Sequence, residues 1–197
     1  TCLITGATNG IGEATARALA GMGAQVVGVG RNLEKCARVE RQIRTLTGNP
    51  NVAYLLADLS DFQQVSQLAD AIPERDPDLH ILDNTAGAIF QRRQMNKPGF
   101  EMTVAQNHLS YFMLTNLLLD RLIASSPARI VVVASGAHNT GMIHFNDLHL
   151  SRGYNGWKAY AQSKLANLLF TYELARRLEG SGVTVNAMTP GFVATGI

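Results

Sequence analysis

Short apolar runs alternate with segments of helical periodicity along the 197-residue chain. Runs rich in β-branched residues predict buried strands, whereas apolar residues three or four positions apart predict helices. Residues 136–156 show no clear period, and a connection of that length in a compact domain is usually functional. The predicted strands are 2–5, 25–29, 52–57, 79–82, 130–134 and 183–188, and the predicted helices are 11–22, 33–46, 62–72, 100–124 and 157–179.

Six alternations of strand and helix are typical of an α/β fold, in which a mostly parallel sheet carries helices on both faces. The strand at 130–133 is apolar at every position, as expected for a strand that is covered on both sides. No repeat, low-complexity tract or linker interrupts the pattern. We therefore expect one doubly wound domain of the Rossmann type over residues 1–197, so that binding and catalytic residues would lie in the same domain.

The ends of the sequence also bear on this expectation. The chain begins inside a predicted strand without an initiator methionine, and it stops just after a loop that follows the last predicted strand. We expect it to be truncated at both ends. A signal peptide, an organelle-targeting segment or a membrane anchor beyond the ends would not be visible, so membrane association stays open.

Charged residues make up only 16% of the chain. The 17 Lys and Arg nearly balance the 15 Asp and Glu, which leaves a formal net charge of +2. The densest basic cluster is Arg92, Arg93 and Lys97, which a solvated loop explains, so nucleic acid is not indicated as a partner. Cys2 and Cys36 lack the spacing of a disulfide framework, which favours the cytoplasm or another reducing compartment. No apolar run approaches the ~20 residues of a membrane-spanning helix.

A glycine-rich turn, TGATNGIG at residues 5–12, joins the first predicted strand to the first predicted helix. Glycines permit a tight turn and a close approach of backbone to a pyrophosphate, and the helix N-terminus then offers free N–H groups. An ordinary turn between strand and helix is the alternative. The spacing T-G-x-x-x-G-I-G differs from the common G-x-G-x-x-G and resembles the short-chain dehydrogenase/reductase family. The resemblance implies coenzyme contacts from Gly6, Asn9, Gly10, Ile11 and Gly12.

The end of the second strand bears on the choice of coenzyme. An NAD enzyme places an acid there to bind the ribose 2′-hydroxyl, whereas this chain has Gly30 followed by Arg31. A guanidinium suits the 2′-phosphate of NADP(H), although a solvent-exposed loop arginine is the alternative. We predict NADP(H), with NAD(H) as second choice. By the resemblance, Asp58 accepts from the adenine amino group beside Leu59, with a helix N-cap as the rival role for Asp58.

The same resemblance implies further coenzyme contacts in the loops after the fourth and sixth predicted strands. The family usually shows N-N-A-G after the fourth strand, whereas this chain has N-T-A-G. Thr85 departs from that pattern, and so does Asp83, where an aliphatic residue is usual. The coenzyme contacts implied in this loop are Asn84, Ala86 and Gly87. The loop after the sixth strand would cover the nicotinamide carboxamide, through the main chain of Val193 and the hydroxyl of Thr195, in the segment that also contains Pro190 and Gly191.

Tyr160 and Lys164 stand four residues apart, on one face near the start of a predicted helix. A phenol of ordinary pKa near 10 is a poor base at neutral pH, but a fixed ammonium nearby stabilises the phenolate. Such a tyrosine can give a proton to a carbonyl oxygen or take one from an alcohol. The spacing alone is common on helix surfaces. Its place downstream of the glycine turn favours catalysis, and the resemblance adds a bond from Lys164 to the nicotinamide ribose.

Two more residues complete the predicted catalytic set. Ser135 ends the fifth strand, where doubly wound sheets present ligands, and its hydroxyl could hold the carbonyl oxygen beside Tyr160. Asn107 lies inside a predicted helix, and by resemblance its main-chain carbonyl holds a water that connects Lys164 to solvent; a core or surface asparagine is the alternative. No metal is expected, because the histidines lack ligand spacing and suit packing or loop roles: His108, His138, His144 and His149.

The string AYAQSKLAN at 159–167 is similar to the branch of retinol dehydrogenases and WW-domain oxidoreductases. That resemblance implies an NADP(H)-dependent oxidoreductase that transfers hydride between nicotinamide and a small, apolar carbonyl or alcohol, with Tyr160 as general acid and base. A non-catalytic NADP(H) sensor or scaffold on the same fold is the alternative. The glycine spacing disfavours a nucleotide-sugar epimerase. Homo-oligomer formation is open.

Overall fold

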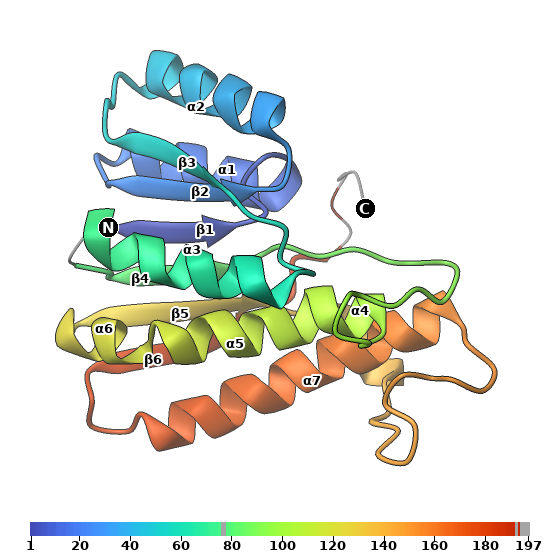
Figure 1. The fold of residues 1–197 in the computed structure, drawn as a ribbon. Coiled ribbons are helices and arrows are strands. Elements are labelled where there is room, and N and C mark those ends of the chain that lie inside the picture. The colour runs from blue at the N-terminus through green and yellow to red at the C-terminus, as the bar shows by residue number, and fades with distance from the viewer. Residues whose placement is uncertain (76–77, 192, 194–197) are drawn as a thin grey trace.

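In the computed structural model, which describes residues 1–75, 78–191 and 193, six strands form one parallel sheet (Figure 1). Their order is β3-β2-β1-β4-β5-β6, so the sheet grows outward in both directions from β1 and β4. The strand order therefore reverses direction between β1 and β4. Doubly wound sheets bind ligands in the crevice at such a point, at the carboxyl ends of the strands. The strands are β1 (Cys2–Thr5), β2 (Val26–Gly30), β3 (Val52–Leu56), β4 (Ile81–Asn84), β5 (Ala128–Val133) and β6 (Val183–Met188).

Helices cover the sheet in two layers. One hydrophobic cluster joins α1 and α2 to β1, β2 and β3, and a second, larger one joins α3, α5, α6 and α7 to the opposite face (Figure 1). None of the described helices combines the length and the apolar character needed to cross a bilayer. The helices are α1 (Gly10–Gly21), α2 (Leu33–Thr47), α3 (Phe62–Arg75), α4 (Met102–Val104), α5 (Ser110–Leu117), α6 (Leu119–Ala124) and α7 (Gly156–Arg177).

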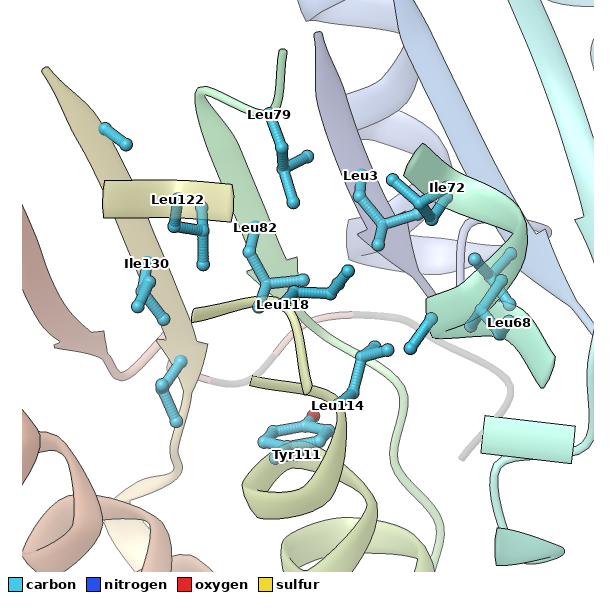
Figure 2. Close-up of a cluster of buried hydrophobic side chains, with 14 of the residues drawn as sticks. Leu3, Leu68, Ile72, Leu79, Leu82, Tyr111, Leu114, Leu118, Leu122 and Ile130 are labelled. Carbon is cyan, nitrogen blue, oxygen red and sulfur yellow. The ribbon is translucent and has the colours of Figure 1, made fainter. Parts of the chain in front are cut away.

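The larger core lies between the sheet and the helices of this second face (Figure 2). Leu68 and Ile72, one turn apart on α3, and Leu114 on α5 point toward the sheet, where Leu3 of β1 and Leu82 of β4 meet them. All five side chains are at most 4% exposed. Burial of this kind contributes roughly 1.5–3 kcal/mol for each large aliphatic side chain, so the core holds β1 and β4, and hence the crevice at their ends, in place.

The structure confirms the α/β fold with a doubly wound parallel sheet, and most elements begin and end within two residues of the prediction. The predicted strand at 79–82 is displaced, since β4 spans Ile81–Asn84. Leu79 is nevertheless fully buried, and its main-chain N–H donates to Ser125 Oγ at 2.9 Å rather than to a neighbouring strand. The periodless segment 136–156 contains a short 3₁₀ turn at Gly136–Thr140.

The prediction of one uninterrupted helix over 100–124 is wrong. The helix begins at Met102, because the carboxylate of Glu101 accepts from the main-chain N–H groups of Thr103 and Val104. A π-helical turn, Ala105–Leu109, follows α4, and a second irregularity at Leu118 separates α5 from α6. π-Helical turns occur frequently at functional sites, and this one contains Asn107.

Candidate active site

The glycine turn packs directly against the loop that follows β4. Gly6 has φ +65°, a conformation that favours glycine, and a Cβ on it would lie 2.8 Å from the Cα of Ala86. A Cβ on Gly12 would lie 2.5 Å from the carbonyl oxygen of Gly6. Only glycine fits at these two positions, so the turn brings the start of α1 close to the ends of β1 and β4.

Two observations at this edge fit a polar ligand such as a dinucleotide. The side chain of Asn9, the N-cap of α1, makes no capping bond, so the first N–H groups of the helix have no capping side chain among the described residues and suit a phosphate. Asn84, at the end of β4, donates from Nδ2 to Thr115 Oγ1 at 3.0 Å, but its Oδ1 is buried without a partner among the described residues. A buried, unpaired acceptor is rare in proteins and fits a site whose ligand supplies the donor.

The residues expected near the adenosine lie at the ends of β2 and β3. Arg31 follows β2 and is exposed, and its guanidinium has no partner among the described residues. Asp58 is half-buried, and its Oδ1 accepts from the N–H and hydroxyl of Ser60 at 2.9 and 2.8 Å. The rival role of Asp58 as helix N-cap is wrong, because Asp61 accepts from the first-turn N–H of Gln63 in α3. The neighbouring Leu59 is buried.

The two departures from the family pattern contact each other. Thr85 donates from Oγ1 to the Asp83 carboxylate at 2.6 Å, and Asp83 is only 5% exposed. The main-chain N–H groups of Thr85 and Ala86 both donate to Thr5 Oγ1, at 2.9 and 3.2 Å, which ties the loop to the end of β1. Burial raises the pKa of Asp83, and the hydrogen bond from Thr85 opposes that shift without cancelling it.

Because its pKa is higher in the folded than in the unfolded chain, Asp83 favours folding most at acid pH. That contribution is lost as the pH rises from the ordinary carboxyl pKa through the raised one. Asp83→Asn keeps an acceptor for Thr85 and removes the charge. We therefore expect it to increase the free energy of unfolding at neutral pH by ~1–2 kcal/mol, and by less below pH ~4. Urea unfolding at both pH values measures this, with the exposed Asp120→Asn as control. An equal effect at both pH values would contradict the assignment.

Tyr160 and Lys164 occupy successive turns of α7, whose start is fixed by Asn155, the acceptor for the N–H of Lys158. The Lys164 side chain is 3% exposed, and its Nζ donates to the carbonyl of Val133 at 2.7 Å. The same Nζ lies 5.6 Å from the centroid of the Tyr160 ring. Burial lowers the pKa of Lys164 to about 8. A buried cation is thus held beside the tyrosine ring, at the carboxyl end of β5.

Ser135 lies two residues beyond Val133, at the same end of β5. Its backbone is extended, and its Oγ accepts from the N–H of Ala137 at 3.2 Å, which caps the 3₁₀ turn. The hydroxyl keeps its own hydrogen for a further acceptor. Since Lys164 is bonded to Val133, the structure brings Ser135 and the Tyr160–Lys164 pair to one strand end.

Asn107 makes contacts that the sequence did not predict. Its side chain pairs with both main-chain groups of Ala88, accepting at 2.9 Å and donating at 2.9 Å, and it donates to Ser163 Oγ at 3.2 Å. Its main-chain carbonyl, which the resemblance assigns to a water, accepts from Asn167 Nδ2 at 2.8 Å. Ser163 and Asn167 were overlooked, although their spacing with Tyr160 and Lys164 places all four on one helix face.

The loop after β6 is described in part. Gly191 has φ +72°, Pro190 is half-buried and Val193 is 46% exposed, whereas Thr195 lies outside the described residues. Within the described part of the chain, no group of His, Cys, Asp and Glu could hold a metal ion. Both cysteines are free and buried.

Comparison with known proteins identifies the family. The family model for short chain dehydrogenases matches residues 1–197. Retinol dehydrogenase 11 of Homo sapiens is 46% identical over 191 residues, which cover 97% of this chain and 60% of that protein. The crystal structure of an uncharacterized protein from Mycobacterium paratuberculosis has a TM-score of 0.86 and 41% identity, and the match covers 97% of this chain and 68% of that one. A short-chain dehydrogenase from Sphingobium yanoikuyae, in complex with NADPH, has a TM-score of 0.82 and 25% identity, with 100% and 72% covered.

The chain therefore belongs to the short-chain dehydrogenase family of oxidoreductases. Within that family it is retinol dehydrogenase-like, which confirms the resemblance inferred from the glycine turn and the tyrosine–lysine helix. The chain spans about 60% of the length of the curated relatives it matches.

Proposed function

We propose that this protein is an NADP(H)-dependent oxidoreductase that interconverts an apolar carbonyl compound and its alcohol. The observation that carries the proposal is the placement of Lys164: a buried ammonium, bonded to Val133 at 2.7 Å and 5.6 Å from the Tyr160 ring, beside the strand end that bears Ser135. A buried cation is costly unless hydrogen bonds and an opposite charge compensate it, and a phenolate at Tyr160 would supply such a charge. The names of the retinol dehydrogenase relatives support an apolar alcohol as substrate.

In this proposal each residue has a distinct role. Ser135 donates a hydrogen bond to the substrate oxygen and orients it. Tyr160 gives a proton to that oxygen during reduction and takes it back during oxidation, while Lys164 stabilises the phenolate. Asn107 holds α7 against the loop after β4 through Ser163 and Ala88. Bound NADPH would supply the hydride.

The coenzyme would lie along the carboxyl ends of the strands. The uncapped start of α1 suits its pyrophosphate, Arg31 its 2′-phosphate, Asp58 its adenine and Lys164 its nicotinamide ribose. The NADPH complex of the Sphingobium relative supports this choice of coenzyme. The remaining proposed contacts are Gly6, Asn9, Gly10, Ile11, Gly12, Leu59, Asn84, Ala86, Gly87, Tyr160, Pro190, Gly191, Val193 and Thr195.

Coenzyme choice gives a direct test. We expect NADPH to bind more tightly than NADH by ~1–3 kcal/mol, because a guanidinium forms charge-assisted bonds to a 2′-phosphate. Arg31→Ala should remove most of that preference and leave NADH binding nearly unchanged. Fluorescence titration of both coenzymes measures it, and Arg41→Ala, an exposed arginine of α2, is the matched control. Equal wild-type affinities for the two coenzymes would refute the assignment of Arg31.

Turnover is tested on the protein at its natural length. NADPH oxidation is followed with a panel of aldehydes, ketones and retinoids, and we expect reduction of at least one apolar carbonyl. A protein that binds NADPH but reduces nothing in the panel would favour the alternative, a coenzyme sensor or scaffold.

A further inference from the structure

Two polar side chains form a hydrogen-bonded series with the main-chain carbonyl of Asn107, and neither has a part in the proposed mechanism. Asn167, on α7, donates from Nδ2 to the carbonyl of Asn107 at 2.8 Å. His108, the next residue of the π-helical turn, lies with its Nδ1 at 2.9 Å from Asn167 Oδ1. Asn107 and Asn167 are both fully buried and His108 is half-buried, so the bond between the two asparagines is shielded from water. Hydrogen bonds in such surroundings are strong when made and costly when lost.

The chemistry of these groups fixes the direction of every hydrogen bond. A carbonyl oxygen can only accept, so the Nδ2 amide of Asn167 must face Asn107. The Oδ1 of Asn167 then faces His108, and it too can only accept. The His108 ring must therefore carry its hydrogen on Nδ1. Burial is the main cause that lowers the pKa of His108, so the ring is neutral near neutral pH and its Nε2 is left as an acceptor.

The position of these three hydrogen-bonded groups connects them to the active site. In a regular α-helix the carbonyl of Asn107 would accept from the N–H four residues later, whereas in the structure it accepts across to α7. Asn107 thus bonds α7 at Ser163, the residue before Lys164, and at Asn167, three residues after it, and it also bonds Ala88 in the loop after β4. A shift of Asn107 would move both of these neighbours of the lysine.

We propose that His108 and Asn167 are positioning residues, which hold the carbonyl of Asn107 against α7 and so fix the placement of Lys164. The proposal rests on the proposed function, since it assigns the pair to that same reaction. His108 orients the amide of Asn167 through its Nδ1–H, and Asn167 passes that orientation on to Asn107. Neither residue touches the substrate.

The test compares two replacements of His108 that separate hydrogen bonding from packing. His108→Asn retains a donor at the position of Nδ1 but loses the ring, whereas His108→Phe retains an aromatic ring against Phe170, whose centroid is 6.3 Å away, but loses the donor. We expect His108→Phe to lower kcat by ~10-fold or more and to leave the Kd for NADPH within ~2-fold, because a small misplacement of catalytic groups slows turnover. His108→Asn should recover most of the wild-type kcat.

A packing role would give the opposite order, so a His108→Phe protein with normal kcat and a slower His108→Asn protein would overturn the proposal. Asn167→Asp adds an independent variant, because an ionised carboxylate cannot donate to Asn107; it should lower kcat like His108→Phe. Asn116→Asp, which changes an exposed asparagine of α5, is the matched control and should leave kcat unchanged. Circular dichroism and thermal melting are recorded for every variant.

The ring itself provides a readout that does not depend on activity. Nitrogen-15 NMR of the unsubstituted protein should show His108 as the neutral tautomer with hydrogen on Nδ1. A ring with its hydrogen on Nε2 would overturn the inference even if the enzyme turns over normally. Failure of the proposed function is a different result, namely a wild-type protein that reduces no carbonyl compound.

Discussion

Tyr160→Phe is expected to lower turnover by ~10²–10⁴-fold, the range that a general acid contributes, while the fold and NADPH binding survive. The change removes one oxygen from a half-buried ring that makes no side-chain hydrogen bond among the described residues, so little else should respond. In the proposed mechanism no other hydroxyl passes the proton to the substrate oxygen. Steady-state reduction and coenzyme titration of the variant and the wild type measure both parts of the prediction.

Tyr172→Phe is the matched control for this experiment. It makes the same change on the same helix, at a tyrosine that is 64% exposed, and it should leave turnover unaltered. A Tyr160→Phe enzyme with turnover near that of Tyr172→Phe would contradict the assignment of Tyr160 as the proton donor.

Ser135→Ala is expected to lower turnover by ~10²-fold or more, because a fixed donor to the reacting oxygen is worth most in the transition state. NADPH binding should stay near the wild-type value, and the lost cap to Ala137, a bond of 3.2 Å, should have a minor effect on stability. Ser126→Ala, just before the opposite end of β5, is the control. If Ser135→Ala and Ser126→Ala turn over alike, Ser135 has only a structural role at the strand end.

The fold could be predicted almost completely from the sequence, because each element carries its own local signal. Ile130 and Val132 of the apolar run at 130–133 become core, as do Val65, Leu68 and Ala69 at helical spacing, whereas Val131 stays half-buried. The interruption within 100–124 could not be predicted from periodicity. A π-helical turn adds one residue to a single turn, and the apolar pattern tolerates that small shift.

The residues of the candidate site also differ in whether the sequence could predict them. Residues that belong to spaced motifs, such as Gly6, Gly12, Tyr160 and Lys164, could be found from the sequence because the spacing itself has a physical reason. The partner of Lys164 could not, because Val133 takes part through its carbonyl, which every residue has.

The pairing of Asp83 with Thr85 shows a further limit. Each residue separately contradicts the family pattern, and only the structure shows the 2.6 Å bond through which one accommodates the other. Side chains two positions apart in a strand point to the same face, so the sequence alone could have suggested a contact between Asp83 and Thr85. Its burial, and hence the raised pKa of Asp83, depends on neighbouring strands that are distant in sequence.

Transfer of deuterium from coenzyme to product shows whether this protein moves hydride from the nicotinamide to an apolar carbonyl. The protein at its natural length is mixed with NADPH that carries deuterium at nicotinamide C4 on either face, together with an apolar aldehyde, and the alcohol is analysed by mass spectrometry. We expect the wild type to form an alcohol with one deuterium on the carbinol carbon, from coenzyme labelled on one face only, and we expect Tyr160→Phe to form almost no alcohol. An unlabelled alcohol from both labelled coenzymes, or equal labelling by the wild type and Tyr160→Phe, would contradict it.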